Sequence, residues 1–347
     1  MLPELVAAVL LFALVAYALT GGADFGGGVW DLFASGLRKA DQRALIERAL
    51  APIWEANHVW LILLVVVMFV ALPTAYAAIS TALHLPILAM LIGIVLRGAA
   101  FVFRSYDPLP GRGAARWRTV FAVSSLLTPL FLGVVMGALL TGQIRLDDQQ
   151  RVRPEVGFIS AWFAPFPFLV GAFVTTLFAW LAALYLAVES ESEPDPDPGL
   201  TRDFRLRAVL SGALAGVLSI VVLALAETQA PHIAARLADG LDAALLQIGA
   251  GVLGFAAIGA AYRARYRLAR ALGATQVIVV VVGLGRAQWP FVIAPDLTFE
   301  AALAPQSVVV PMLVALAIGT PILLVALIWL YRVFKSRAPA RSRGGPS

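Results

Sequence analysis

Nine long apolar segments, separated by short polar stretches, follow one another along the chain. Each is close to the roughly 20 residues that an α-helix needs to cross a bilayer. Because lipid offers no partner to backbone N–H and C=O groups, each segment is predicted to be a helix. The predicted spans are residues 3–21, 56–80, 84–104, 119–141, 161–187, 207–227, 242–262, 273–294 and 307–331. The pattern predicts an all-α polytopic membrane protein, in which two four-helix bundles and one peripheral helix would account for every span.

Composition supports this fold class. Of the 347 residues, 61% are hydrophobic and 14% are charged, whereas a soluble domain has about half and about a quarter. The apolar runs are too long and unbroken for a membrane β-barrel, and the lack of cysteine excludes disulfides and thiolate metal sites. The first segment has no preceding basic residues and is interpreted as a retained span. We expect one transmembrane domain over residues 1–335 and a short basic cytoplasmic tail over residues 336–347.

The basic residues alternate from loop to loop. Of the 26 Lys and Arg residues, 20 lie in loops on one predicted side of the membrane, five lie on the other side, and Arg97 lies within a span. By the positive-inside rule the amino terminus is outside and the carboxyl terminus is cytoplasmic. The basic isoelectric point therefore reflects membrane topology, and no nucleic-acid partner is expected.

The second span opens with a polar cluster, "PIWEANHVWLI" at residues 52–62. Glu55 and His58 are three residues apart and share a helix face, beside Trp54 and Asn57. A carboxylate and an imidazole that lie close together in a buried setting can exchange protons near neutral pH. Alternatively, the two groups sit at headgroup level and pair locally, since the helix dipole favours a glutamate in the first turn.

A second polar feature is Asp24, which stands among five glycines in "GGADFGGGVW" at residues 21–30. Glycines let backbones approach closely, so they would admit a neighbouring helix or water, and Asp24 would line that space near Glu55. Alternatively, the stretch is a flexible turn in which Asp24 caps the next helix. Arg97 either extends to the membrane surface or pairs with a carboxylate or a ligand acid group.

Histidine is scarce, which limits haem chemistry. The chain has three histidines, and His58 alone is predicted on an inward-facing position, whereas membrane haems usually take axial ligands from inward-facing His or Met. No phosphate-binding loop, His-Glu-x-x-His or Gly-x-Ser-x-Gly motif occurs. The residues therefore predict no cofactor bound directly by this chain.

The two polar elements resemble subunit II of the cytochrome bd-type quinol oxidases, which carries Gly-x-Asp-x-Gly and then Trp-acid-Gly-Asn-x-x-Trp. Later stretches are similar to later helices of that family: "ALPTAYAA" (71–78), "LRGAAFVFRS" (96–105), "RWRTVFAVSSLLTPLFLGVVMGALLTG" (116–142), "APFPFLVG" (164–171) and "QWPFVI" (288–293). The resemblance covers most of the chain in the same order and is strongest over residues 20–142. Glu55 replaces the commoner aspartate, Ala56 replaces glycine, and His58 stands where an acidic or amide residue is frequent. In these departures the chain is similar to the variant described as cyanide-insensitive.

The resemblance implies a haem-free subunit of a complex in the bacterial inner membrane. In that family the partner, subunit I, carries haems b and d, oxidises ubiquinol or menaquinol and reduces oxygen to water. Subunit II supports the haem site and contributes to a cytoplasmic proton path. The resemblance implies that Asp24, Glu55 and His58 transfer protons, and that Trp54, Asn57 and Arg97 support them. A small accessory subunit and a structural quinone or lipid are further components that the family allows.

Two other functions are compatible with the residues. Intramembrane acids and glycine-rich helices also suit a secondary transporter that couples protons to a solute. A purely structural subunit, without chemistry of its own, would have the same spans. Copurification with a haem-bearing polypeptide would distinguish the oxidase subunit from the transporter.

Overall fold

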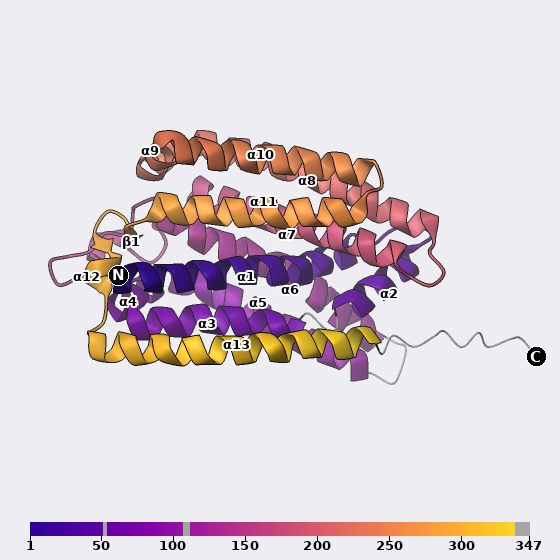
Figure 1. Cartoon of the computed structure of the whole chain (residues 1–347), viewed down its shortest axis with the longest axis horizontal. Coiled ribbons are helices and arrows are strands. Elements are labelled where there is room, and N and C mark those ends of the chain that lie inside the picture. The colour runs from indigo at the N-terminus through magenta and orange to yellow at the C-terminus, as the bar shows by residue number, and fades with distance from the viewer. Residues whose placement is uncertain (51–53, 107–111, 337–347) are drawn as a thin grey trace, which may run out of the picture.

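The computed structural model describes residues 1–50, 54–106 and 112–336, and these residues are mostly helical (Figure 1). The helices are α1 (Leu2–Leu32), α2 (Lys39–Leu50), α3 (Trp54–Ala71), α4 (Pro73–Ala82), α5 (His84–Tyr106), α6 (Arg112–Leu140), α7 (Pro165–Glu191), α8 (Pro198–Gln229), α9 (Pro231–Ala238), α10 (Gly240–Tyr262), α11 (Tyr266–Gln288), α12 (Phe299–Ala302) and α13 (Gln306–Ser336). A short turn of 3-10 helix, η1 (Pro154–Val156), and an antiparallel hairpin of β1 (Phe291–Ile293) and β2 (Leu297–Thr298) join them. The predicted all-α membrane fold is confirmed.

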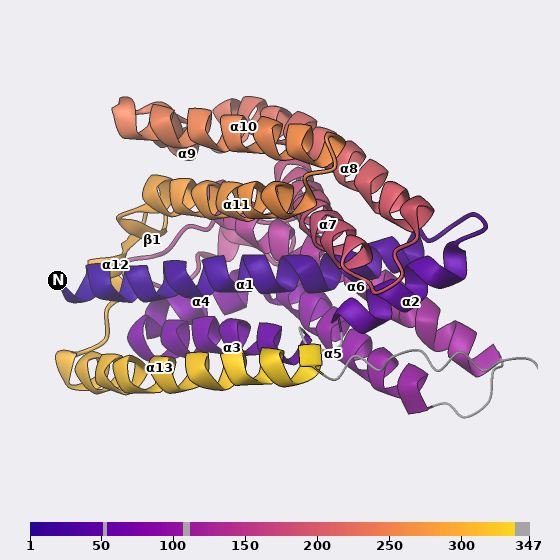
Figure 2. The same ribbon diagram turned by 45° about the vertical axis from the view of Figure 1, so that its right-hand side comes forward.

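The long helices form two groups of four with one helix outside them, as the sequence predicted. Helices α1, α3, α5 and α6 pack together, and α7, α8, α10 and α11 form the second group. Contacts of α7 with α1 and α6 join the two groups. Helix α13 lies along the outside and packs on α3, as both views show (Figures 1 and 2).

Eight of the described helices are long and apolar enough to cross a membrane, and a bent pair provides a ninth if it counts as one span. In that pair, the chain bends by 116° between the helical residues Asn57–Ala71 and Pro73–Ala82. Pro73 has no backbone N–H, and proline disfavours the α conformation of the residue before it. Leu72 accordingly has φ −131° and ψ 55°. The prediction of one helix over 56–80 is therefore wrong beyond Ala71, where the chain turns.

Helix α1 is longer than the predicted span 3–21. It continues to Leu32, so the glycine-rich segment is helical. The alternative, a flexible turn in which Asp24 caps the next helix, is therefore wrong. The glycines lie against other helices. A Cβ atom on Gly26 would come within 2.0 Å of the carbonyl oxygen of Phe178 in α7. A side chain there would force the helices apart, so the glycines do admit a neighbouring helix.

The two ends of the bundle carry different connections. The chain begins at one end, together with α9, α12 and the hairpin, and α13 finishes at the opposite end, the end at which α2 also lies (Figure 1). The hairpin replaces the end of the predicted span 273–294, because α11 stops at Gln288, shortly before Pro290. The sequence did not predict α2, a mostly polar helix of 12 residues that follows α1.

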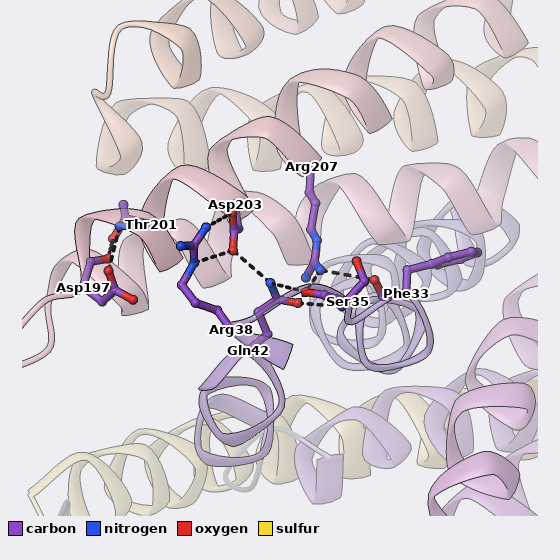
Figure 3. A network of polar contacts seen from close by, with 9 residues as sticks. Phe33, Ser35, Arg38, Gln42, Asp197, Thr201, Asp203 and Arg207 are labelled. Atoms are coloured by element: carbon purple, nitrogen blue, oxygen red, sulfur yellow. Dashed lines mark hydrogen bonds and ion pairs between the residues drawn. The ribbon is translucent and has the colours of Figure 1, made fainter. Parts of the chain in front are cut away.

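Helix α2 is fixed to the start of α8 by a network of polar contacts (Figure 3). Arg38 Nε and Nη2 donate to Asp203 Oδ2 and Oδ1 at 2.9 and 2.8 Å. Gln42 Nε2 donates to the same carboxylate at 2.9 Å, and Gln42 Oε1 accepts from Arg207 Nη2 at 2.7 Å. The guanidinium of Arg207 also lies over the ring of Trp30, 5.3 Å from its centre. These contacts join α1, α2 and α8 at one end of the bundle.

Candidate functional site

The most deeply buried ion pair in the described part of the chain lies between α1, α5 and α6. Asp24 is fully buried, and Arg97 is 2% exposed. Arg97 Nη2 donates to Asp24 Oδ1 at 2.5 Å and to the carbonyl oxygen of Asp24 at 3.2 Å. Of the two alternatives for Arg97, pairing with a carboxylate is therefore correct. A charge inside a membrane protein is expensive unless it is paired in this way, so the pair marks a candidate functional centre.

Side chains from α1 and α6 surround the guanidinium of Arg97. Its Nε donates to Ser125 Oγ at 3.0 Å, and Ser125 in turn donates to the carbonyl oxygen of Phe121 at 2.7 Å. The rings of Phe25 and Phe121 lie 4.8 and 4.9 Å from the guanidinium carbon. Arg97 is thus held by a carboxylate, a hydroxyl and two aromatic rings, which fixes its position.

Asn57 adds α3 to this centre. Its side chain is fully buried, and Nδ2 lies 3.4 Å from Asp24 Oδ2, at the long end of hydrogen-bond distances. Gly21 makes room for the amide, since a Cβ atom on Gly21 would lie 2.8 Å from Asn57 Oδ1. Gly28 does the same for Ser125, whose Oγ would lie 2.1 Å from such an atom. The glycines flanking Asp24 therefore accommodate polar groups from other helices.

The structure brings together three of the six predicted site residues, namely Asp24, Asn57 and Arg97. Trp54 and Glu55 begin α3, and their side chains lie outside the described residues. His58 follows Asn57 on α3 and is partly buried. Its place on the helix is therefore established, whereas its role and that of Glu55 remain predictions.

A second buried carboxylate, which the sequence analysis missed, lies two turns further along α1. Asp31 is fully buried. Arg43 of α2 reaches it, with Nε 3.6 Å from Oδ1 and Nη2 donating to the backbone carbonyl of Asp31 at 3.3 Å. The seven-residue spacing from Asp24 places both acids on one helix face, which is a signal that the sequence did contain.

The three histidines lie on three different helices, α3, α5 and α9. His84 begins α5 and is exposed, while His232 lies on α9 against Gly142. Burial lowers the pKa of His232, so the neutral imidazole is favoured there. In the described ranges, no group of three or more His, Asp or Glu side chains is close enough to hold a metal ion.

Comparison with known proteins identifies the family. The family model for cytochrome bd terminal oxidase subunit II matches residues 2–334. The chain belongs to this family. A chain of the solved bd oxidase from Geobacillus thermodenitrificans has the same fold as this chain, with a TM-score of 0.75 and 18% identity. The match covers 97% of this chain and 99% of that one.

Two curated relatives match this subunit II chain over shorter regions. Subunit 2 of the cytochrome bd-I ubiquinol oxidase of Escherichia coli K12 is 27% identical over 218 residues, which is 61% of this chain and 53% of the relative. Subunit 2 of the cytochrome bd ubiquinol oxidase of Bacillus subtilis is 32% identical over 174 residues, 48% of this chain and 49% of the relative. The matched region thus spans about half the length of each relative.

Proposed function

We propose that the chain is the subunit II of a bd-type quinol oxidase and acts in a complex with a haem-bearing subunit I. The complex would oxidise ubiquinol or menaquinol and reduce oxygen to water in the bacterial inner membrane. The observation that carries the proposal is the buried centre of Asp24, Arg97 and Asn57, which lies on the elements that resemble the family's motifs. The family match favours this function over a proton-coupled transporter.

The proposed orientation places the amino terminus outside and the carboxyl terminus in the cytoplasm. The loops that hold most of the basic residues, including the turns between α7 and α8 and between α10 and α11, gather at the end where α2 lies (Figure 1). The positive-inside rule makes this end cytoplasmic. Asp31 lies nearer to this end than Asp24, so the carboxylates on α1 would face the side from which protons are taken up.

The proposed role of this subunit is to support the haem site and to carry protons toward it. Asp24, Glu55 and His58 would transfer protons, with Trp54, Asn57 and Arg97 positioning them. Asp24 Oδ1 is occupied by Arg97, whereas Oδ2 has the longer contact with Asn57. Oδ2 is therefore the oxygen that we expect to exchange a proton. The haems b and d would lie in subunit I, and a small accessory subunit and a structural quinone or lipid would complete the assembly.

The experiment that tests this function is Glu55→Gln in the purified two-subunit complex. The substitution keeps the shape of the side chain and removes its titratable proton. We expect oxygen uptake and proton consumption per haem to fall together at unchanged haem content. Glu300→Gln, an exposed residue of α12 at the opposite end, is the matched control.

Three outcomes would separate the alternatives. Unchanged rates in Glu55→Gln would contradict a proton role for Glu55. Loss of haem content without a change in rate per haem would indicate a purely structural subunit. A chain that purifies alone, colourless and stable, would contradict the oxidase complex and support a transporter.

A further inference from the structure

One face of α1 carries a continuous series of polar or glycine positions, at Tyr17, Gly21, Asp24, Gly28 and Asp31. The spacings of four, three, four and three residues keep them on the same side of the helix. All five are buried. At a rise of about 1.5 Å per residue, the series runs for about 21 Å along the helix axis. It starts at the α2 end of the bundle and reaches well into the hydrophobic interior.

Each glycine in the series makes room for a polar side chain from another helix. Asn57 of α3 lies against Gly21, and Ser125 of α6 lies against Gly28. Polar groups therefore continue between Tyr17, Asp24 and Asp31, which would otherwise be about 10 Å apart. We call this series of Tyr17, Asn57, Asp24, Ser125 and Asp31 the α1 stripe.

The inner end of the stripe holds two buried polar atoms that lack partners. Tyr17 is 2% exposed and packs among apolar residues such as Trp60 and Phe178. Neither Tyr17 Oη nor Asn57 Oδ1 has a hydrogen-bond partner in the described parts of the chain. Leaving such a group unsatisfied costs about 1–3 kcal/mol. Bound water satisfies buried polar groups of this kind, and Tyr17 lies close enough to Asp24 and Arg97 to interact with both charges.

We propose that the α1 stripe is a proton-transfer route, in which Asp31 accepts protons from the cytoplasmic side and Tyr17 passes them on near the bilayer centre. The proposal rests on the proposed function and extends it to Tyr17, Asp31 and Ser125, to which the family resemblance assigns no role. Because Asp31 is buried, it takes a proton from water that enters at the α2 end, and it releases a proton to water beside Ser125, from which the proton reaches Asp24 Oδ2. Water between Asn57 and Tyr17 then carries it onward. Tyr17 Oη accepts one proton and donates its own, so its charge is unchanged after each transfer.

Two arginines lie beside the acids of the stripe. Arg97 pairs with Asp24 and Arg43 lies beside Asp31, so each carboxylate faces one guanidinium. Each pair is close to neutral overall, and a transferred proton adds the positive charge that moves. A stripe with acids alone would accumulate negative charge, and one with arginines alone would repel protons.

The test is Tyr17→Phe in the purified complex with its haem-bearing partner, reconstituted in vesicles. The substitution removes one hydroxyl and keeps the ring, so it leaves the packing among Trp60 and Phe178 intact. We expect oxygen uptake and proton uptake per haem to fall about tenfold, since positioned proton-transfer groups contribute at least this much. Haem content and KM for quinol should stay unchanged, and the solvent deuterium isotope effect should increase. Tyr76→Phe, a partly buried tyrosine on α4, is the matched control.

The outcomes separate the stripe from the proposed function. If Tyr17→Phe keeps the full rate while Glu55→Gln slows the enzyme, the stripe is wrong and the proposed function stands. If both variants keep the full rate, the stripe and the proton role of Glu55 are both wrong. If Tyr17→Phe alone is slow, protons follow the stripe without Glu55.

Asp31 is tested in the same way. Asp31→Asn is expected to slow proton uptake by about the same factor. Because this variant leaves Arg43 without its carboxylate, the double variant Asp31→Asn with Arg43→Gln repeats the measurement without an unpaired charge. A double variant with the full rate at normal haem content would remove Asp31 from the route.

Discussion

Two ion pairs of this protein join distant segments in very different surroundings. Asp24 and Arg97 meet inside the bundle, where their side chains are 0% and 3% exposed. Arg145 and Asp296 meet in loops at the end of the bundle away from α2. Their side chains are 49% and 16% exposed, and Arg145 Nε lies 2.9 Å from Asp296 Oδ2. The geometry of the two contacts is similar, so the difference between them is the solvent.

The comparison shows why only the inner pair marks a functional centre. Water screens an exposed pair, and such pairs add little to stability. A buried pair must offset the loss of hydration, so removing one partner leaves a charge that nothing compensates. Well-packed apolar residues in place of a buried ion pair such as Asp24 and Arg97 often give a protein at least as much stability. Their presence therefore calls for a reason beyond folding, and the proton transfer proposed above would be one.

The largest expected effect comes from breaking the inner pair on one side. Arg97→Met leaves the carboxylate of Asp24 buried without its partner, which should cost about 3–5 kcal/mol of stability. The measurement is the thermal unfolding of the purified complex, together with its haem content. Asp24→Asn combined with Arg97→Met removes both charges and should recover most of the loss. A single variant as stable as the double variant would contradict the description of the pair as buried and coupled.

The next effect concerns the close packing of α1 against α7 beside this centre. In Gly26→Ala the added Cβ would meet the backbone of Phe178, which cannot move aside as a side chain can. Overpacking of this kind costs about 1–3 kcal/mol. Gly216→Ala on α8 is the matched control, because no atom lies within 4 Å of its Cβ position. Unfolding temperatures should fall for Gly26→Ala and stay level or rise for Gly216→Ala, and equal temperatures would contradict the close approach of α1 and α7.

A smaller effect is expected where α2 meets α8. Arg38→Gln removes both hydrogen bonds to Asp203, but Gln42 still donates to that carboxylate. We expect little change in global stability and faster proteolysis of the loop between α1 and α2. Limited proteolysis of the protein in vesicles measures the rate at which this loop is cleaved. Lys39→Gln, which also removes one positive charge, is the control. Unchanged cleavage would show that the network does not hold α2 in place.

The smallest effect should come from the outer pair. Burial by itself raises the pKa of Asp296. Hydrogen bonds from Arg145 and from the backbone N–H of Leu146, together with the positive charge of Arg145, lower it. These lowering effects are larger than that of burial, so the pKa of Asp296 lies below its ordinary value of 3.8. The stabilisation that the Asp296 carboxylate gives to the folded protein is therefore complete at a pH above the ordinary pKa. It is lost as the pH falls through the lower pKa of the folded protein. Arg145→Gln should barely change stability at neutral pH and should reduce the loss of stability in acid. Unfolding curves at neutral and acidic pH test this, and a large loss at neutral pH would contradict the comparison.

Part of the site was predictable from local sequence. Asp24, Asn57 and Arg97 stood out because polar residues are rare in apolar spans, and they do meet in the structure. Ser125 gave no such signal, because a serine in a membrane helix usually bonds to its own backbone, as Ser125 also does. Its contact with Arg97 depends on how α5 and α6 pack, which no local pattern specifies.

By itself the sequence determined the class of the protein, the helices and the alternation of basic loops, because the bilayer demands long apolar segments and sorts charge by side. Only the tertiary structure decided that "GGADFGGG" stays helical and that Asp24 pairs with Arg97. It also decided that Asn57 and Ser125 pack against the face of α1 that carries Tyr17, Asp24 and Asp31. Glycine permits both turns and tightly packed helices, and the neighbouring helices of the bundle determine which of the two forms.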